Sequence, residues 1–258
     1  MPRLDTSRRV FFSFPQVTDP GRHHDYNAWH VHDHQPENRA LDGVLHGDRW
    51  VRTPQCRAAS PATDSPVGLA DYVAMYWFAD PVEESVAEWY SLGQTTLELG
   101  RRPELAWTTR RLTGFFRPLE CRVSDEVVIS AGALPYRQHA GVLLEVLQVA
   151  APGSAGADTA ARAWHTTHLP AVRRHDGVLG TWTFASRDVT LVGEGATGVA
   201  GGTTRLRSPG ELLVALHFCD RDPVGLAPAL DQPVPDGAAV VLRTPLVSIG
   251  ADWGWFDA

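Results

Sequence analysis

The sequence predicts an α+β protein built from two tandem ferredoxin-like βαββαβ repeats. Two observations lead to this prediction. Patterns typical of strands and helices occur in the same order twice along the 258 residues, and a short histidine-containing motif recurs once in each half. A four-stranded sheet with helices on one face leaves its other face uncovered. Two such sheets packed face to face would form one barrel-like unit, with a pocket expected in the enclosed space.

The first repeat is expected to span residues 1–125. It opens with a strand rich in Phe and Val, and its two helices end near Gly43 and Gly100, where a glycine favours a helix stop. The expected order is strand, helix, strand, strand, helix, strand, over residues 9–17, 25–41, 45–52, 71–79, 80–100 and 111–123.

Residues 126–139 are rich in turn formers and are expected to connect the repeats, so the second repeat spans residues 140–258. The Gly-rich stretch 187–208 lacks the Gly-Lys-Ser/Thr ending of a phosphate-binding loop, and we expect a mobile flap there. The same order of strands and helices is expected over residues 141–150, 158–175, 178–186, 211–219, 223–230 and 238–249.

Composition excludes several classes of function. The net charge is −7 and the arginine pairs are scattered, which argues against a nucleic-acid partner. Three widely separated cysteines do not form a disulfide framework or a structural zinc motif. The chain has neither an apolar run long enough to span a membrane nor an apolar leader at residue 1, so a cytoplasmic protein is expected.

The recurring motif is local. His34-Gln35-Pro36 with a following Asp-Gly matches His168-Leu169-Pro170 with its own Asp-Gly at the same separation, and Trp29-His30 matches Trp164-His165 one residue out of step. Residues 26–36, with Gly43 and the strand after it, resemble the EthD-like dimeric α+β barrel family. The resemblance implies a barrel that forms between two subunits in single-repeat relatives, and within one chain here. Relatives include cofactor-free lactone isomerases and quinone-forming monooxygenases, and more distant barrels bind haem.

The first helix contains the leading catalytic candidates. Tyr26, His30, His34 and Glu37 share one face at helical spacing. Imidazole titrates near neutrality and is suited to removing a proton from a carbon or phenol held in an apolar pocket. Three of these four residues, His30, His34 and Glu37, are also the candidate metal ligands, although no HExxH motif is present.

The strands supply further candidates. His46, Asp48 and Trp50 alternate on one side of the second strand, where the first two could form an acid–base pair and Trp50 could contact substrate. Two further groups are candidates for substrate binding, the aromatic residues of the third strand and an arginine of the fourth that could hold a carboxylate or phenolate. These residues are Tyr72, Tyr76 and Arg117.

These observations favour a cofactor-independent enzyme that acts by histidine-mediated proton transfer on a small cyclic or aromatic metabolite. The reaction would be an isomerisation, cyclisation, dehydration or oxygen-dependent oxidation, in a protein that needs no metal and could form a homodimer. One alternative is a metal- or haem-dependent barrel enzyme that uses His30, His34 and Glu37 as ligands. Another is a protein that binds a small molecule without catalysis.

Overall fold

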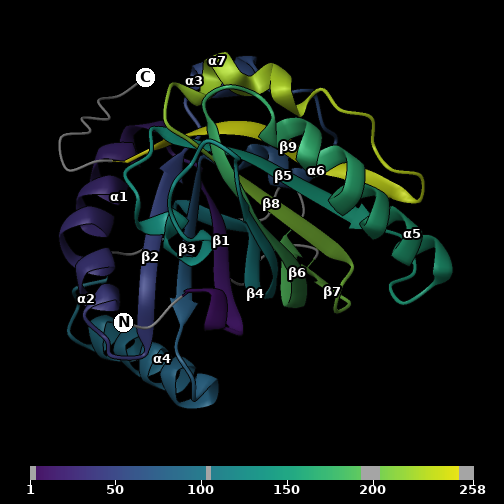
Figure 1. The fold of residues 1–258 in the computed structure, drawn as a ribbon. Helices are drawn as coiled ribbons and strands as arrows, with labels where there is room; N and C mark the ends of the chain where they lie inside the picture. The colour runs from purple at the N-terminus through teal and green to yellow at the C-terminus, as the bar shows by residue number, and fades with distance from the viewer. Residues whose placement is uncertain (1–3, 103–105, 193–203, 250–258) are drawn as a thin grey trace.

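The computed structural model describes residues 4–102, 106–192 and 204–249 (Figure 1). Within them, nine strands form one antiparallel sheet in the order β4-β1-β3-β2-β9-β5-β8-β6-β7, and β4 also pairs with β6. Because this pairing joins the first strand of the order to the eighth, eight strands close into a barrel. Strand β7 lies outside the barrel, paired with β6.

The chain contains nine strands and seven α-helices within the described residues. The strands are β1 (Arg9–Val17), β2 (Val44–Val51), β3 (Tyr72–Phe78), β4 (Thr108–Val123), β5 (Gly141–Val149), β6 (Val178–Val192), β7 (Thr204–Arg207), β8 (Leu212–Cys219) and β9 (Ala238–Ser248). The helices are α1 (His23–Trp29), α2 (Gln35–Arg39), α3 (Pro54–Ala58), α4 (Val82–Glu98), α5 (Ala155–Ala163), α6 (Leu169–Arg173) and α7 (Pro223–Leu226).

The strand order shows two equivalent halves. The first half has the order β4-β1-β3-β2 and the second has β9-β5-β8-β6. The halves meet at two places, where β2 pairs with β9 and where β4 pairs with β6. The chain therefore has the predicted fold class, two βαββαβ units closed into a dimeric α+β barrel within one polypeptide. The boundaries at residues 125 and 140, and an origin by duplication, stay predictions.

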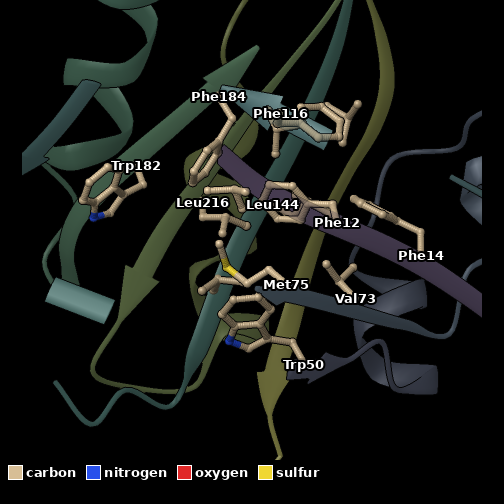
Figure 2. Close-up of a cluster of buried hydrophobic side chains, with 14 of the residues drawn as sticks. Phe12, Phe14, Trp50, Val73, Met75, Phe116, Leu144, Trp182, Phe184 and Leu216 are labelled. Carbon is tan, nitrogen blue, oxygen red and sulfur yellow. The ribbon is translucent and has the colours of Figure 1, made fainter. Parts of the chain in front are cut away.

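The barrel interior is filled by apolar side chains from both halves. Figure 2 shows Phe12 of β1, Leu144 of β5 and Leu216 of β8 pointing toward one another, and all three are fully buried. Trp77 and Trp182 meet edge-on in the same core, with ring centroids 4.6 Å apart. The expectation that the enclosed space becomes a pocket is therefore wrong, because large aromatic side chains pack against one another there.

The helices cover the outside of the barrel and differ between the halves. Helices α1, α2 and α4 lie along the first half, whereas α5 and α6 lie along the second (Figure 1). The second helix position is occupied by the 17-residue α4 in the first half but by the four-residue α7 and a short 3₁₀ turn, Ala227–Leu230, in the second. The two outer faces are therefore covered unequally.

Three elements differ from the sequence prediction. Strand β6 continues to Val192 and pairs with β7, so the ends of the predicted flap form a hairpin, while residues 193–203 lie outside the described residues. The predicted helix over residues 25–41 is divided into α1, a π-helical turn and α2, and the one over residues 158–175 into α5, a π-helical turn and α6. Within the described residues, no helix is long and apolar enough to span a bilayer.

Candidate functional site

The first helix of each half contains one turn of π-helix, η3 (His30–His34) and η6 (Trp164–His168). Each turn ends two residues before a proline, Pro36 or Pro170. A proline ring presses on the carbonyl four residues earlier and cannot donate a hydrogen bond, so the backbone widens before it instead of continuing as α-helix. Aligned by these turns, His30 is equivalent to Trp164, which corrects the match of Trp29-His30 to Trp164-His165.

A cavity of about 250 Å³ lies between the outer face of the first-half sheet and its helices. The aromatic part of its wall is made by Phe11, Tyr26, Trp29, Tyr76, Trp89 and Tyr90. The polar part includes Ser13, His30, His34, Asn38, Gln94, Thr96, Arg102, Thr108 and Arg110. A cavity of about 150 Å³ holds benzene and ordinary ligand pockets begin near roughly 300 Å³, so this one has room for a ligand of one or two rings.

The two histidines of the π-turn contact each other in this wall. The His34 ring stacks on Trp29, with centroids 4.6 Å apart and planes at 26°. The His30 ring meets His34 edge-on at 5.0 Å, and Tyr76 approaches His34 edge-on at 6.3 Å. Aromatic packing therefore fixes both imidazole planes beside the cavity.

Asn38, one turn after His34, selects the tautomer of that histidine. The Asn38 side-chain amide nitrogen lies 3.2 Å from His34 Nδ1 and also donates to the His34 carbonyl. Because the amide nitrogen can only donate, Nδ1 accepts and the ring proton sits on Nε2. His34 is thus held as a neutral imidazole with an Nε2–H donor.

Burial of His30 and partial burial of His34 keep both imidazoles neutral. Burial, with the positive charges of Arg110 and Arg102, lowers the pKa of His34 to about 3. The pKa of His30, which is 3% exposed, also lies well below 6.5, because of burial first and the charge of Arg49 second. At neutral pH neither ring carries a charge, so a ring nitrogen without a donor beside it can accept a proton.

Three buried polar atoms of the cavity wall have no hydrogen-bond partner among the described residues. They are His30 Nδ1, Tyr76 Oη and Trp89 Nε1. A buried polar atom left unpaired costs about 1–3 kcal/mol, and native proteins retain few of them. Other unpaired atoms of this kind are spread over the described residues, but these three belong to side chains that line a cavity, where a ligand or water could supply the missing partners.

Arg49 lies one layer behind the wall. Its guanidinium is stacked on two tyrosine rings, 5.1 Å from the Tyr26 centroid and 4.4 Å from that of Tyr72. It is 1% exposed, and none of its three side-chain nitrogens has a hydrogen-bond partner in the described part of the chain. The Tyr72 hydroxyl is itself bonded to Asn27 and His23, both at 2.8 Å, so Tyr72 supports the wall from behind.

Gly47 positions Tyr76. The two residues are register partners in β2 and β3, and a Cβ on Gly47 would lie 2.7 Å from the Tyr76 ring. The missing side chain therefore lets the ring lie across the strand and reach the cavity.

In the second half the equivalent space is filled. Ser13 pairs with Ala74 as Glu145 pairs with Ala215, so Glu145 occupies the position of Ser13. Glu145 accepts a hydrogen bond from the Trp164 indole and forms an ion pair with Arg243, and His168 Nε2 lies 3.0 Å from its carboxylate. Burial opposes its ionisation, but these partners hold its pKa below the usual value. This half is built as a structural network.

The predicted residues His46, Asp48 and Trp50 face the opposite side of the sheet. Trp50 is part of the barrel core, and Tyr136 of the connecting segment packs against His46. His46 Nε2 is 3.9 Å from Asp48 Oδ2, too far for a hydrogen bond, and the carboxylate is closer to His139 Nε2, at 3.4 Å. Strand alternation separates this group from His30 and His34, so the structure does not unite them in one site.

Two further placements differ from the sequence prediction. Arg117 is exposed and does not line the cavity. Glu37 turns away from the histidines and pairs with Arg101 at 2.7 Å, because the π-turn interrupts the predicted helical face. Within the described residues, no three His, Cys, Asp or Glu side chains are placed to hold a metal ion.

The sequence prediction includes Tyr26, His30, His34 and Tyr76 in the wall, but omits most of its polar groups. Asn38 had a local signal, since it lies four residues after His34 on the same helix. Arg110 and Ser13 could have been found only by knowing which strand face lies outward. Arg102 lies outside the helices and strands, so no periodic pattern in the sequence marks it as part of the wall.

No known family model matches the sequence, and no curated protein matches it. An anthrone oxidase-like protein is similar in structure, with a TM-score of 0.46 and 10% identity over 99% of both chains. A candidate monooxygenase from Fusobacterium nucleatum has a TM-score of 0.48 and 6% sequence identity, over 95% of this chain and 94% of that one. A second candidate monooxygenase, from Lactobacillus acidophilus, has a TM-score of 0.43 and 9% sequence identity, over 93% of this chain and 94% of that one. The fold class is defined by the strand order of the chain itself.

Proposed function

We propose that the chain is an enzyme that moves a proton on a small cyclic or aromatic metabolite without a cofactor, by isomerisation, cyclisation, dehydration or oxygen-dependent oxidation. The observation that supports it is the pair of neutral imidazoles, His30 and His34, in the wall of a cavity sized for one or two rings. Membership of the EthD-like family, a cytoplasmic location and a homodimer belong to the same proposal.

The geometry suggests separate roles for the two histidines. His30 is the base, because its ring is neutral and its Nδ1 has no partner among the described residues. His34 offers its Nε2–H to an oxygen of the substrate, since Asn38 occupies Nδ1. Asn38 is a positioning residue that fixes this tautomer. Tyr26, whose pKa is raised by burial, stays a neutral phenol in the wall.

The low basicity of the imidazoles limits the substrate to an acidic C–H or O–H. The charges of Arg49, Arg102 and Arg110, which lower the histidine pKa values, also lower the pKa of a substrate proton held in the same cavity. Proton transfer is therefore supported by stabilising the anion that forms, more than by a strong base.

The same low basicity favours a non-catalytic binding protein as the second candidate. A metal or haem enzyme built on His30, His34 and Glu37 has less support, because Glu37 pairs with Arg101 outside the cavity. The experiment must therefore separate proton transfer from binding.

Nitrobenzisoxazole, a small aromatic probe, provides that separation. Its C–H proton passes to a base while the ring N–O bond breaks, and the phenolate product is followed by absorbance. We expect the wild-type rate to exceed that of free imidazole, and His30→Ala to lower it by roughly 10²-fold or more. His32→Ala, an exposed neighbour, is the matched control. Equal rates in wild type and His30→Ala, with the probe bound, would leave the binding protein as the function.

A further inference from the structure

Among the described residues, the charged side chains in the wall of the first-half cavity are all arginines. Arg102 and Arg110 line it, Arg49 lies behind it, and no Asp or Glu is among the described residues of its wall. Neither Arg102 nor Arg110 forms an ion pair with a described residue. The two are close enough that the charge of Arg110, after burial, lowers the pKa of Arg102. Adjacent like charges of this kind are costly without an anion beside them.

Two other arginines provide a contrast, because carboxylates of the chain neutralise them. Arg101, next to Arg102, is paired with Asp33 and Glu37, each at 2.7 Å. In the second half, buried Arg243 is paired with Glu145, which occupies the position that Ser13 holds in the first. The carboxylate that balances the second half is therefore replaced in the first by a small hydroxyl and open space.

The unpaired polar groups around the cavity are mainly donors. Trp89 Nε1 can only donate, and Tyr76 Oη carries a donor proton. His34 adds its Nε2–H. A wall of donors is complementary to a ligand rich in acceptor lone pairs.

We propose that the ligand of this cavity is a one- or two-ring organic acid bound as its anion, with the anionic group between Arg102 and Arg110 and the ring against Trp29 and Tyr76. The inference rests on the proposed function for the site and names its substrate class. It also links binding to chemistry. The anion offsets the charges that lower the pKa of His34, so the imidazoles become stronger bases when the ligand is present.

Naphthoate and its neutral amide, naphthamide, test the charge requirement at constant ring size, by calorimetric titration of the whole chain. We expect naphthoate to bind at least about tenfold more tightly than the amide, and this preference to fall to within about threefold in Arg102→Gln and in Arg110→Gln. Arg174→Gln, an exposed arginine of the second half, is the matched control and should keep the preference.

Equal affinity for acid and amide in the wild type would overturn the inference, as would a preference that survives in both cavity variants. Because a charge change could disturb the fold, Arg102→Lys and Arg110→Lys are measured too. Lysine keeps the charge, so these variants should retain most of the preference. Binding is measured without turnover, so loss of anion selectivity with intact proton transfer from nitrobenzisoxazole contradicts this inference alone.

Discussion

The pH dependence of stability tests whether His34 is buried and neutral. An unfolded histidine has a pKa near about 6.5, whereas in the folded chain the pKa of His34 is about 3. Below about pH 6.5 His34 is protonated in the unfolded chain, whereas in the folded chain it stays neutral until the pH falls to about 3. The folded state therefore loses stability as the pH falls through this window. Between about pH 7 and pH 5, His34, which is half-buried, accounts for a loss of up to about 2 kcal/mol.

Urea unfolding of three proteins at both pH values isolates this contribution. We expect His34→Gln to lose up to about 2 kcal/mol less than wild type between pH 7 and pH 5, because glutamine does not titrate. His32→Gln, which alters an exposed histidine of the same turn, should match the wild-type pH dependence. If His34→Gln and His32→Gln show the same pH dependence, His34 is not held neutral by burial and the reasoning fails.

Three further changes, two of them with a control variant, test the second-half network, the barrel core and the packing of Tyr76 in the site. Glu145→Ala leaves Arg243 buried without its partner and should cost about 3–5 kcal/mol in urea unfolding, whereas Glu120→Ala, which breaks partly exposed pairs, should cost under about 1 kcal/mol. Trp77→Ala opens the barrel core and should cost about 3–5 kcal/mol by the same measurement. Gly47→Ala should destabilise the fold and weaken naphthoate binding in calorimetry by displacing Tyr76. Gly93→Ala, whose Cβ meets nothing within 4 Å, should gain up to about 1 kcal/mol from helix propensity; the opposite order of these two variants would contradict the account.

The sequence predicts the fold class well because its signals are local. Alternating apolar residues mark the strands, and the repeated order of elements specifies two βαββαβ units closed into a barrel. What it could not predict is which side of the sheet holds the open space. Phe12 and Leu144 were as compatible with a pocket wall as with a core, and only their mutual packing shows that the barrel is full.

The part of the candidate site that lies within one helix or one strand was predictable from the sequence. Tyr26, His30 and His34 follow from helical spacing, and Tyr76 from strand alternation. The charges around the site could not be predicted, because they depend on contacts between residues far apart in the sequence, such as the stacking of Arg49 on Tyr26. The π-turn before Pro36 also changes which residues share a face, so Glu37 could not be placed by counting at 3.6 residues per turn.

The position of a bound ligand tests the central claim most directly, namely that the cavity outside the first half is the functional site. The indole N–H signals of the nine Trp residues, assigned by Trp→Phe variants, report this position in a nitrogen–proton correlation spectrum. Adding whichever naphthalene probe binds should shift the signals of Trp29 and Trp89, which line the cavity. Those of Trp77 in the barrel core and Trp164 in the second half should stay in place. Shifts at Trp77 or Trp164 without shifts at Trp29 and Trp89 would contradict the account.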